Sequence, residues 1–172
     1  EIYNHMFLRN TLISAGQAPS WRGHSDTETL LAGFDAWGVQ GMLEQTIGMF
    51  SFSVWDRQTK TLTLGRDRLG EKPLYYGWQG QGNKAVFLFG SELKALKAHP
   101  SFENNISRSA LTLQLRHNCI PAPYSIYEGI AKLLPGSLLT VSLRHREPKI
   151  WSYWSAVEVA ESGAANSFVE SA

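Results

Sequence analysis

The stretch Met49-Phe50-Ser51-Phe52-Ser53-Val54-Trp55 alternates large apolar side chains with small ones. A period of two is typical of a β-strand, and here it predicts a strand with one deeply buried face. Residues 56–60 then predict a hairpin turn, and residues 61–65 predict the return strand. The same reasoning predicts strands at 74–78 and 85–89 around a turn at 80–83, and at 138–143 with a partner at 149–154. The chain is therefore expected to be built on antiparallel hairpins.

Helices are predicted around these strands from capping residues and apolar spacing. The four predicted helices, with their capping residues, are 5–15 (Asn4), 26–37 (Ser25), 92–99 (Ser91) and 108–117 (Ser107). Ser25 and Glu28 match the Ser-x-x-Glu capping box, in which each side chain binds the backbone of the other residue. Leu30 and Leu31 are expected to face a core, and Gly38 to end the helix. Helices flanking antiparallel hairpins indicate an α+β domain rather than a doubly wound parallel sheet.

Composition and charge exclude several classes of function. The 172 residues carry 16 Lys and Arg against 15 Asp and Glu, for a formal net charge of +1. That balance argues against nucleic-acid binding, which needs a surplus of basic side chains on one surface. No apolar run approaches the ~18 residues of a membrane helix, so no membrane partner is expected. The histidines show no metal-ligand spacing, so no metal is predicted, and the single cysteine, Cys119, indicates a reducing cytoplasm rather than a disulfide framework.

Five motifs occur in an order that resembles a known family. They are Glu-Ile-Tyr-Asn at 1–4, His-Ser-Asp-Thr-Glu at 24–28, Gly-Met-Phe at 48–50 with Val-Trp-Asp at 54–56, Arg-Asp-Arg-Leu-Gly-Glu-Lys-Pro-Leu-Tyr at 66–75, and Ser-Glu-Leu-Lys-Ala-Leu at 91–96. Together they resemble the class II glutamine amidotransferase domain of the glutamine-hydrolysing asparagine synthetases. Residues 124–127 and 132–136 resemble a later segment of that family. The resemblance covers residues 1–154, and residues 155–172 are interpreted as a linker toward a synthetase domain outside this chain.

The resemblance implies an N-terminal-nucleophile hydrolase fold, an αββα sandwich of two antiparallel sheets between helix layers. In that family a cysteine at the start of the mature chain attacks the side-chain amide of glutamine, with its own α-amine as base. An oxyanion hole holds the tetrahedral intermediate. The ammonia then travels to a synthetase domain. Glutamine and that domain are the implied partners, while ATP and Mg are implied only for the synthetase domain, with no cofactor in this chain.

The start of the chain departs from the family pattern. Residue 1 is Glu, whereas the nucleophilic Cys and the Asn-Gly pair of the oxyanion hole would precede it. We therefore expect an incomplete domain, truncated at its N-terminus, with no catalytic residue of its own and no glutaminase activity alone. Removing an N-terminal part from a two-sheet sandwich exposes strand edges and apolar surface. We also expect self-association, as a homodimer that covers the exposed sheet.

Two residues are candidates for binding glutamine. The resemblance makes Asp26 the carboxylate that accepts the α-ammonium group, and it places Glu1 where backbone contacts meet the substrate. Considered without the resemblance, Asp26 is a first-turn acidic residue, stabilised by the helix dipole by about 0.3–1 kcal/mol. Cys119 lies two positions after His117, and we interpret it as a small, at least partly buried side chain rather than a nucleophile.

The charged loop that follows residue 65 has two interpretations. Arg66, Asp67, Gly70 and Lys72 either contact the synthetase domain and line the path of ammonia, or they form an ion-paired turn that fixes a hairpin. In the second interpretation Gly70 supplies a positive φ. The second interpretation is preferred for the charges, and the loop is kept as an interface candidate.

Three functions remain open. The leading one is a glutaminase domain that supplies ammonia for ATP-dependent amidation of aspartate or a related carboxylate. The alternatives are a non-catalytic remnant or interaction module with the same fold, and an amidotransferase domain for a sugar-phosphate or phosphoribosyl acceptor. The resemblance at residues 91–96 and 132–136 favours the asparagine-synthetase branch.

Overall fold

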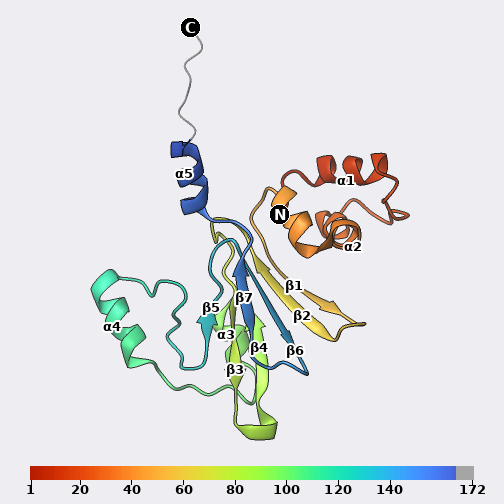
Figure 1. The fold of residues 1–172 in the computed structure, drawn as a ribbon. Helices are drawn as coiled ribbons and strands as arrows, with labels where there is room; N and C mark the ends of the chain where they lie inside the picture. Colours follow the sequence, from red (N-terminus) through yellow and green to blue (C-terminus); the bar gives the residue numbers. More distant parts are fainter. Residues whose placement is uncertain (166–172) are drawn as a thin grey trace. The chain divides into compact units, whose positions relative to one another are not determined.

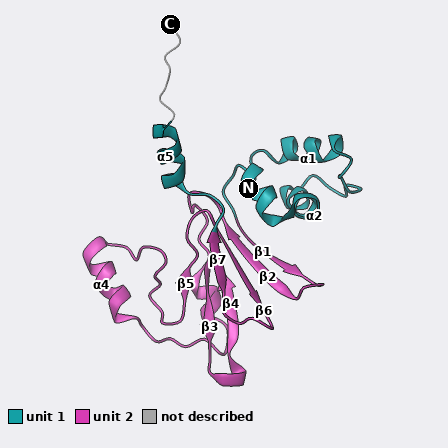
Figure 2. Cartoon of the chain, in the orientation of Figure 1, with its two compact units in different colours: residues 1–50, 152–172 teal, residues 51–151 magenta. Residues whose placement is uncertain are grey.

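The computed structural model describes residues 1–165, which belong to two compact units. One unit comprises residues 1–50 and the described part of 152–172, and the other comprises residues 51–151 (Figure 2). None of the helices within residues 1–165 combines the length and the apolar character that crossing a bilayer requires.

The first unit contains three helices: α1 (His5–Ser14), α2 (Asp26–Gln45) and α5 (Ala156–Ala165). Helix α1 packs on α2, and its Leu8 and Leu12 are fully buried, as their spacing predicts. Helix α5 lies within the stretch that the sequence assigned to a linker, and the rest of that stretch, 166–172, lies outside the described residues.

Gly38 divides α2 into two helical segments. Its φ of 72° and ψ of 166° are not helical, so the first segment ends there, as predicted, and a second segment that was not predicted continues to Gln45. The two halves pack closely, because a Cβ at Gly33 would lie 2.2 Å from the sulfur of Met42. Leu31 was expected to face a core, yet 54% of its surface is exposed.

The chain start pairs with the segment that follows α2. Ile2 bridges Gly48 in antiparallel fashion, and the Tyr3 N–H donates to the Ile47 carbonyl at 2.8 Å. The Asn4 side chain does not cap α1. It donates to the carbonyl of Gln45 and accepts from the N–H of Ile47, each at 2.9 Å, so it joins the chain start to the end of α2.

The second unit contains two antiparallel sheets, as the sequence predicted (Figure 1). The strands, in order across each sheet, are β1 (Ser51–Asp56), β2 (Thr61–Arg66), β6 (Ser137–Ser142) and β7 (Lys149–Ser152), and then β4 (Val86–Gly90), β3 (Tyr75–Gln79) and β5 (Ala131–Lys132). A core cluster of Leu64, Leu139 and Val141 from one sheet with Leu74 and Leu133 is flanked by side chains of β3 and β4. The two sheets therefore pack through this core, and together with the helices they give the α+β architecture that the sequence predicted.

Details of the second unit differ from the sequence prediction. β1 is only half-buried on its apolar face, and its Trp55 is 46% exposed. The hairpin at 80–83 contains the short 3₁₀ helix η1 (Gly82–Lys84), and β5 was missed because two residues show no alternation.

Two further helices belong to this unit. Helix α3 (Leu93–Lys97) follows Glu92, so Ser91 does not cap it; its hydroxyl lies 3.3 Å from that of Ser51 instead. Helix α4 (Arg108–His117) is capped by Ser107, as predicted, and it is set apart from the sheets on long loops (Figure 1). Asn118 ends α4 in the left-handed conformation, with φ 55°.

Candidate functional site

Asp26 lies at the N-terminus of α2, against the start of the chain. Ser25 caps the helix by accepting the Thr27 N–H at 3.1 Å, so Asp26 is the first helical residue and lies at the positive end of the helix dipole. The Asp26 Oδ2 accepts the Ile2 N–H at 3.0 Å. Beside it, the ammonium group of Glu1 donates to the Met49 carbonyl at 2.7 Å. The two predicted binding residues, Asp26 and Glu1, therefore meet at one place in the first unit.

The surroundings of Asp26 keep its carboxylate ionised. The hydrogen bond from the Ile2 N–H is the largest cause that lowers the pKa of Asp26, and partial burial opposes it. The Thr27 N–H, the N-terminal ammonium and His5 lower the pKa of Asp26 further. The side chain is only partly buried, so an ionised oxygen at this position can accept a bond from a bound ammonium group.

Glu28 does not complete the predicted capping box. Its carboxylate accepts the N–H of Arg22 at 2.7 Å and the N–H of Gly23 at 3.1 Å, both from the segment before α2. It also lies 3.6 Å from Nη2 of Arg9 on α1. The carboxylate therefore binds the backbone of residues 22 and 23, before the helix, rather than the backbone of the capping residue Ser25.

Arg9 is a buried arginine, with only 6% of its surface exposed. Its Nη2 donates to the Gly23 carbonyl at 2.6 Å, and its guanidinium carbon lies 3.9 Å from the centre of the Trp21 ring. Sequence reasoning missed this residue, because nothing local in α1 shows which segment its side chain reaches.

The charged loop of the second unit is a structural turn. The Arg66 guanidinium donates to the carbonyls of Lys72, Leu133 and Gly70 at 2.8, 2.6 and 2.5 Å. Asp67 is fully buried, and its carboxylate accepts the N–H groups of Glu71 and Lys72 at 2.8 and 3.0 Å. Burial lowers the pKa of Arg66, and the neighbouring Asp67 carboxylate opposes this effect. Side-chain bonds to the backbone therefore hold the turn, rather than ion pairs alone.

Gly70 takes the positive φ that the sequence predicted. Its φ is +71°, and an added Cβ would lie 2.8 Å from Cγ of Pro135 and 3.0 Å from the guanidinium carbon of Arg66. Of the four predicted loop residues, Lys72 is the exposed one, while its backbone N–H and carbonyl bind Asp67 and Arg66. The role of these four residues as an interface stays a prediction.

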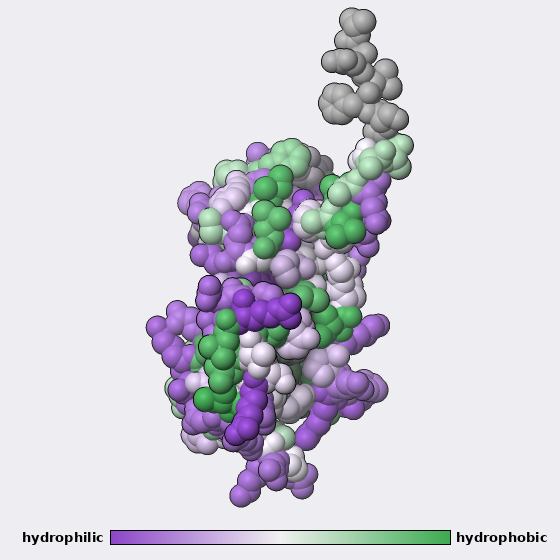
Figure 3. Space-filling model, turned by 90° about the vertical axis from the view of Figure 1, so that its left-hand side faces the viewer, coloured by the Kyte–Doolittle hydropathy of each residue, from purple (hydrophilic) through white to green (hydrophobic). Residues whose placement is uncertain are grey.

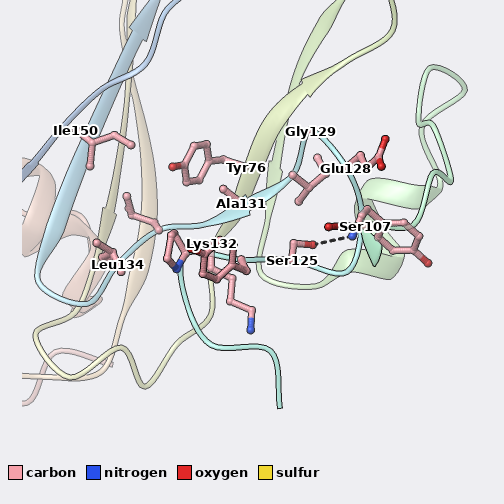
Figure 4. Close-up of a pocket in the computed structure, with 14 residues that line it drawn as sticks. Tyr76, Ser107, Ser125, Glu128, Gly129, Ala131, Lys132, Leu134 and Ile150 are labelled. Atoms are coloured by element: carbon pink, nitrogen blue, oxygen red, sulfur yellow. Dashed lines mark hydrogen bonds between the residues drawn. The ribbon is translucent and has the colours of Figure 1, made fainter. Parts of the chain in front are cut away.

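A cavity of about 560 Å³ opens in the second unit, and sequence reasoning did not single it out (Figure 4). It is lined mainly by apolar side chains from β3, β5, β7 and the segment 123–130. The lining includes parts of the two later stretches that carry the resemblance, 124–127 and 132–136. The buried Ser125 hydroxyl accepts the Tyr127 N–H at 3.3 Å and so shapes the wall.

Cys119 is exposed, which corrects the expectation of a buried or half-buried side chain. It follows the left-handed Asn118, which turns the chain away at the end of α4. The nearby Lys132 ammonium donates to the Ile120 carbonyl. Burial lowers the pKa of Lys132, and Arg66 adds to this effect, while Cys119 opposes it.

Comparison with known proteins decides the family. A family model described as a glutamine amidotransferase domain matches residues 1–154. The chain belongs to this family.

Similar proteins include three glutamine-hydrolysing asparagine synthetases of Bacillus subtilis. Asparagine synthetase 3 is 36% identical over 157 residues, which cover 90% of this chain and 24% of the relative. Asparagine synthetase 2 is 30% identical over 165 residues, covering 92% of this chain and 21% of the relative. Asparagine synthetase 1 is 33% identical over 141 residues, which cover 82% of this chain and 21% of the relative. The amidotransferase chain thus spans about a quarter of the length of the curated relatives it matches.

Proposed function

We propose that residues 1–154 form the glutamine-binding body of a glutaminase that supplies ammonia to an asparagine-synthetase-like reaction. The observation that carries the proposal is the Asp26 carboxylate, ionised and partly exposed at the N-terminus of α2, beside Ile2 and Glu1. Such a group fits the α-ammonium of glutamine, because a charge-assisted hydrogen bond is stronger than a neutral one. The similarity to glutamine-hydrolysing relatives supports the same substrate.

The acceptor side of the reaction belongs to polypeptide outside the matched residues. We propose aspartate or a related carboxylate as acceptor, activated with ATP and Mg in a synthetase domain, because the matched relatives are asparagine synthetases. Residues 155–172 are proposed to lead toward that domain, with α5 as their first part. The 172 residues alone are proposed to be inactive, because their only cysteine is the internal Cys119, which has no free α-amine.

Self-association is a further part of the proposal. Large apolar side chains reach the surface in both units (Figure 3), among them Phe7 at 67% and Leu31 at 54% exposure in the first unit. Contiguous exposed apolar surface favours association, and a second copy is the partner that we propose. Sedimentation velocity should show a dimer whose fraction rises with concentration, whereas a monomer at all concentrations would oppose this part.

The binding proposal is tested with a pair of ligands that differ in one group. Backbone amide NMR of the 172-residue chain is followed while L-glutamine or glutaramate, which is glutamine without its α-amino group, is added. L-glutamine should shift the amides of Ile2, Asp26 and Thr27 and should bind at least about tenfold more tightly than glutaramate.

Two variants complete this experiment. Asp26→Asn should remove the preference for L-glutamine. Asp56→Asn is the matched control, because Asp56 also accepts backbone N–H bonds but lies at the end of β1, in the other unit. Equal affinity of the wild-type chain for the two ligands would contradict the proposal.

A further inference from the structure

The segment that leads into α2 has no regular structure of its own. Residues 17–25 form neither helix nor strand, yet they set where α2 begins and therefore where Asp26 lies. Backbone of this kind is positioned by side chains that bind its N–H and C=O groups. In the first unit Glu28 and Arg9 bind this backbone at residues 22 and 23, and the Thr29 hydroxyl donates to the Ser25 carbonyl at 3.4 Å.

Glu28 and Arg9 hold the segment from two sides. Glu28 accepts the N–H groups of Arg22 and Gly23, whereas Arg9 donates to the carbonyl of Gly23. The guanidinium also stacks over the ring of Trp21. Because Arg9 belongs to α1, these contacts link the segment to the helix that directly follows Ile2 and Glu1.

We propose that Arg9, Trp21 and Glu28 are positioning residues that keep the Asp26 carboxylate at the Ile2 N–H and oriented to receive the ammonium group of glutamine. This inference rests on the proposed function of Asp26. None of the three residues is required to touch the substrate. Their effect passes through residues 22–25, which precede Asp26 directly.

The chemistry of the cluster favours positioning over stability alone. Arg9 Nη1 and Trp21 Nε1 are buried and have no hydrogen-bond partner within residues 1–165. Unsatisfied buried donors are unfavourable, and the ion pair with Glu28, whose side chain is 25% exposed, adds little stability to offset them. Because these contacts contribute little net stability, we attribute them to the geometry that they impose on residues 22–25.

Glu28→Gln tests the proposal when its affinities for L-glutamine and for glutaramate are measured as described above. A glutamine side chain at position 28 has the same size as glutamate, but it lacks the negative charge that pairs with Arg9 and binds two N–H groups. We expect the dissociation constant for L-glutamine to rise about tenfold, while that for glutaramate stays unchanged. A purely structural role would leave the ratio of the two affinities unchanged, so the ratio is the deciding quantity.

A second readout does not depend on a ligand. The pKa of the Asp26 carboxyl, followed by carbon-13 NMR, should rise in Glu28→Gln, because a displaced Asp26 loses the Ile2 N–H bond. Loss of the Glu28 charge alone would lower the pKa of Asp26, so the two explanations predict opposite signs. Glu92→Gln is the matched control, since it breaks an ion pair with Lys94 that is exposed and lies in the other unit.

The outcomes separate this inference from the proposed function. If Glu28→Gln keeps the full preference for L-glutamine while Asp26→Asn loses it, the positioning role is wrong and the function of Asp26 stands. If the wild-type chain shows no preference, the proposed function itself fails. Arg9→Lys, which keeps the charge but loses the planar stack, should lower the preference as well. Unfolding of both variants would assign the cluster to stability and overturn the inference.

Discussion

Asp26 and Asp67 are two aspartates in charged stretches of similar appearance, and the structure uses them in opposite ways. Asp67 has no exposed surface, and its two carboxylate oxygens accept the backbone N–H groups of Glu71 and Lys72. The Asp26 Oδ2 accepts the Ile2 N–H at 3.0 Å, its Oδ1 accepts only a long 3.5 Å bond from the Thr27 hydroxyl, and the side chain stays partly exposed. The Asp67 carboxylate therefore stabilises the fold, while the Asp26 carboxylate remains able to bind a ligand.

This difference distinguishes a structural charge from a binding one. A carboxylate whose bonds all go to its own turn can be removed only at the expense of stability. A carboxylate at a helix N-terminus with an exposed oxygen contributes little to stability and is available to a cation. The distinction would be wrong if Asp67 variants lost ligand preference rather than stability, or if Asp26 variants lost stability rather than ligand preference.

The largest effect is expected for Asp67→Ala. The variant removes a fully buried carboxylate and leaves two partly buried N–H groups without their acceptor, so the free energy of unfolding should fall by about 2–4 kcal/mol. Urea unfolding measures the loss. Asp67→Asn, which keeps the shape and one acceptor, should lose less than Asp67→Ala. A change below about 1 kcal/mol in Asp67→Ala would show that the turn does not depend on this carboxylate.

Gly70→Ala should have the next largest effect in the same turn. Alanine at φ +71° is strained, and its Cβ would crowd Pro135 and Arg66. We expect a loss of about 2 kcal/mol in unfolding free energy. Gly163→Ala is the control, because Gly163 lies in α5 with nothing within 4 Å of an added Cβ. Equal stabilities of the two variants would contradict the strain argument.

Asp26→Asn should have the smallest effect on stability, below about 1 kcal/mol, together with the loss of ligand preference described above. A lowered pKa of Asp26 stabilises the fold at pH values above the carboxyl's unfolded-state pKa, and this stabilisation is lost as pH falls through the folded-state pKa. The stability gap between wild type and Asp26→Asn should therefore close below about pH 4. Unfolding curves across this pH range measure it, and a gap that widens toward acid would be the wrong sign.

Much of the fold follows from local patterns in the sequence. The hairpin of β1 and β2, the Ser107 cap and the left-handed Asn118 depend on neighbours within a few residues, which the sequence shows directly. Ser25 was likewise predicted as the cap of α2. Features of this kind need no knowledge of distant contacts.

The features that were missed depend on distant partners. Glu28 was predicted to bind Ser25, but Arg9 and the backbone of Arg22 and Gly23 draw its carboxylate away. The second helical segment of α2, beyond Gly38, was missed, and its Met42 packs on Gly33 in a contact that spacing alone does not reveal. The hydrogen bonds of Asp67 to two backbone N–H groups were missed for the same reason. The sequence alone does not show whether a charged loop residue is exposed to solvent or bound to the backbone.

The central claim is that residues 1–154 are the body of a glutaminase whose nucleophile precedes Glu1. The most direct test joins to Glu1 a segment with the family pattern, beginning with Cys and ending in Asn-Gly, and measures glutamate released from glutamine. We expect release by this fusion, none by its Cys→Ala version, and a raised KM for glutamine when Asp26→Asn is added. A folded fusion that releases no more glutamate than its Cys→Ala version would contradict the account.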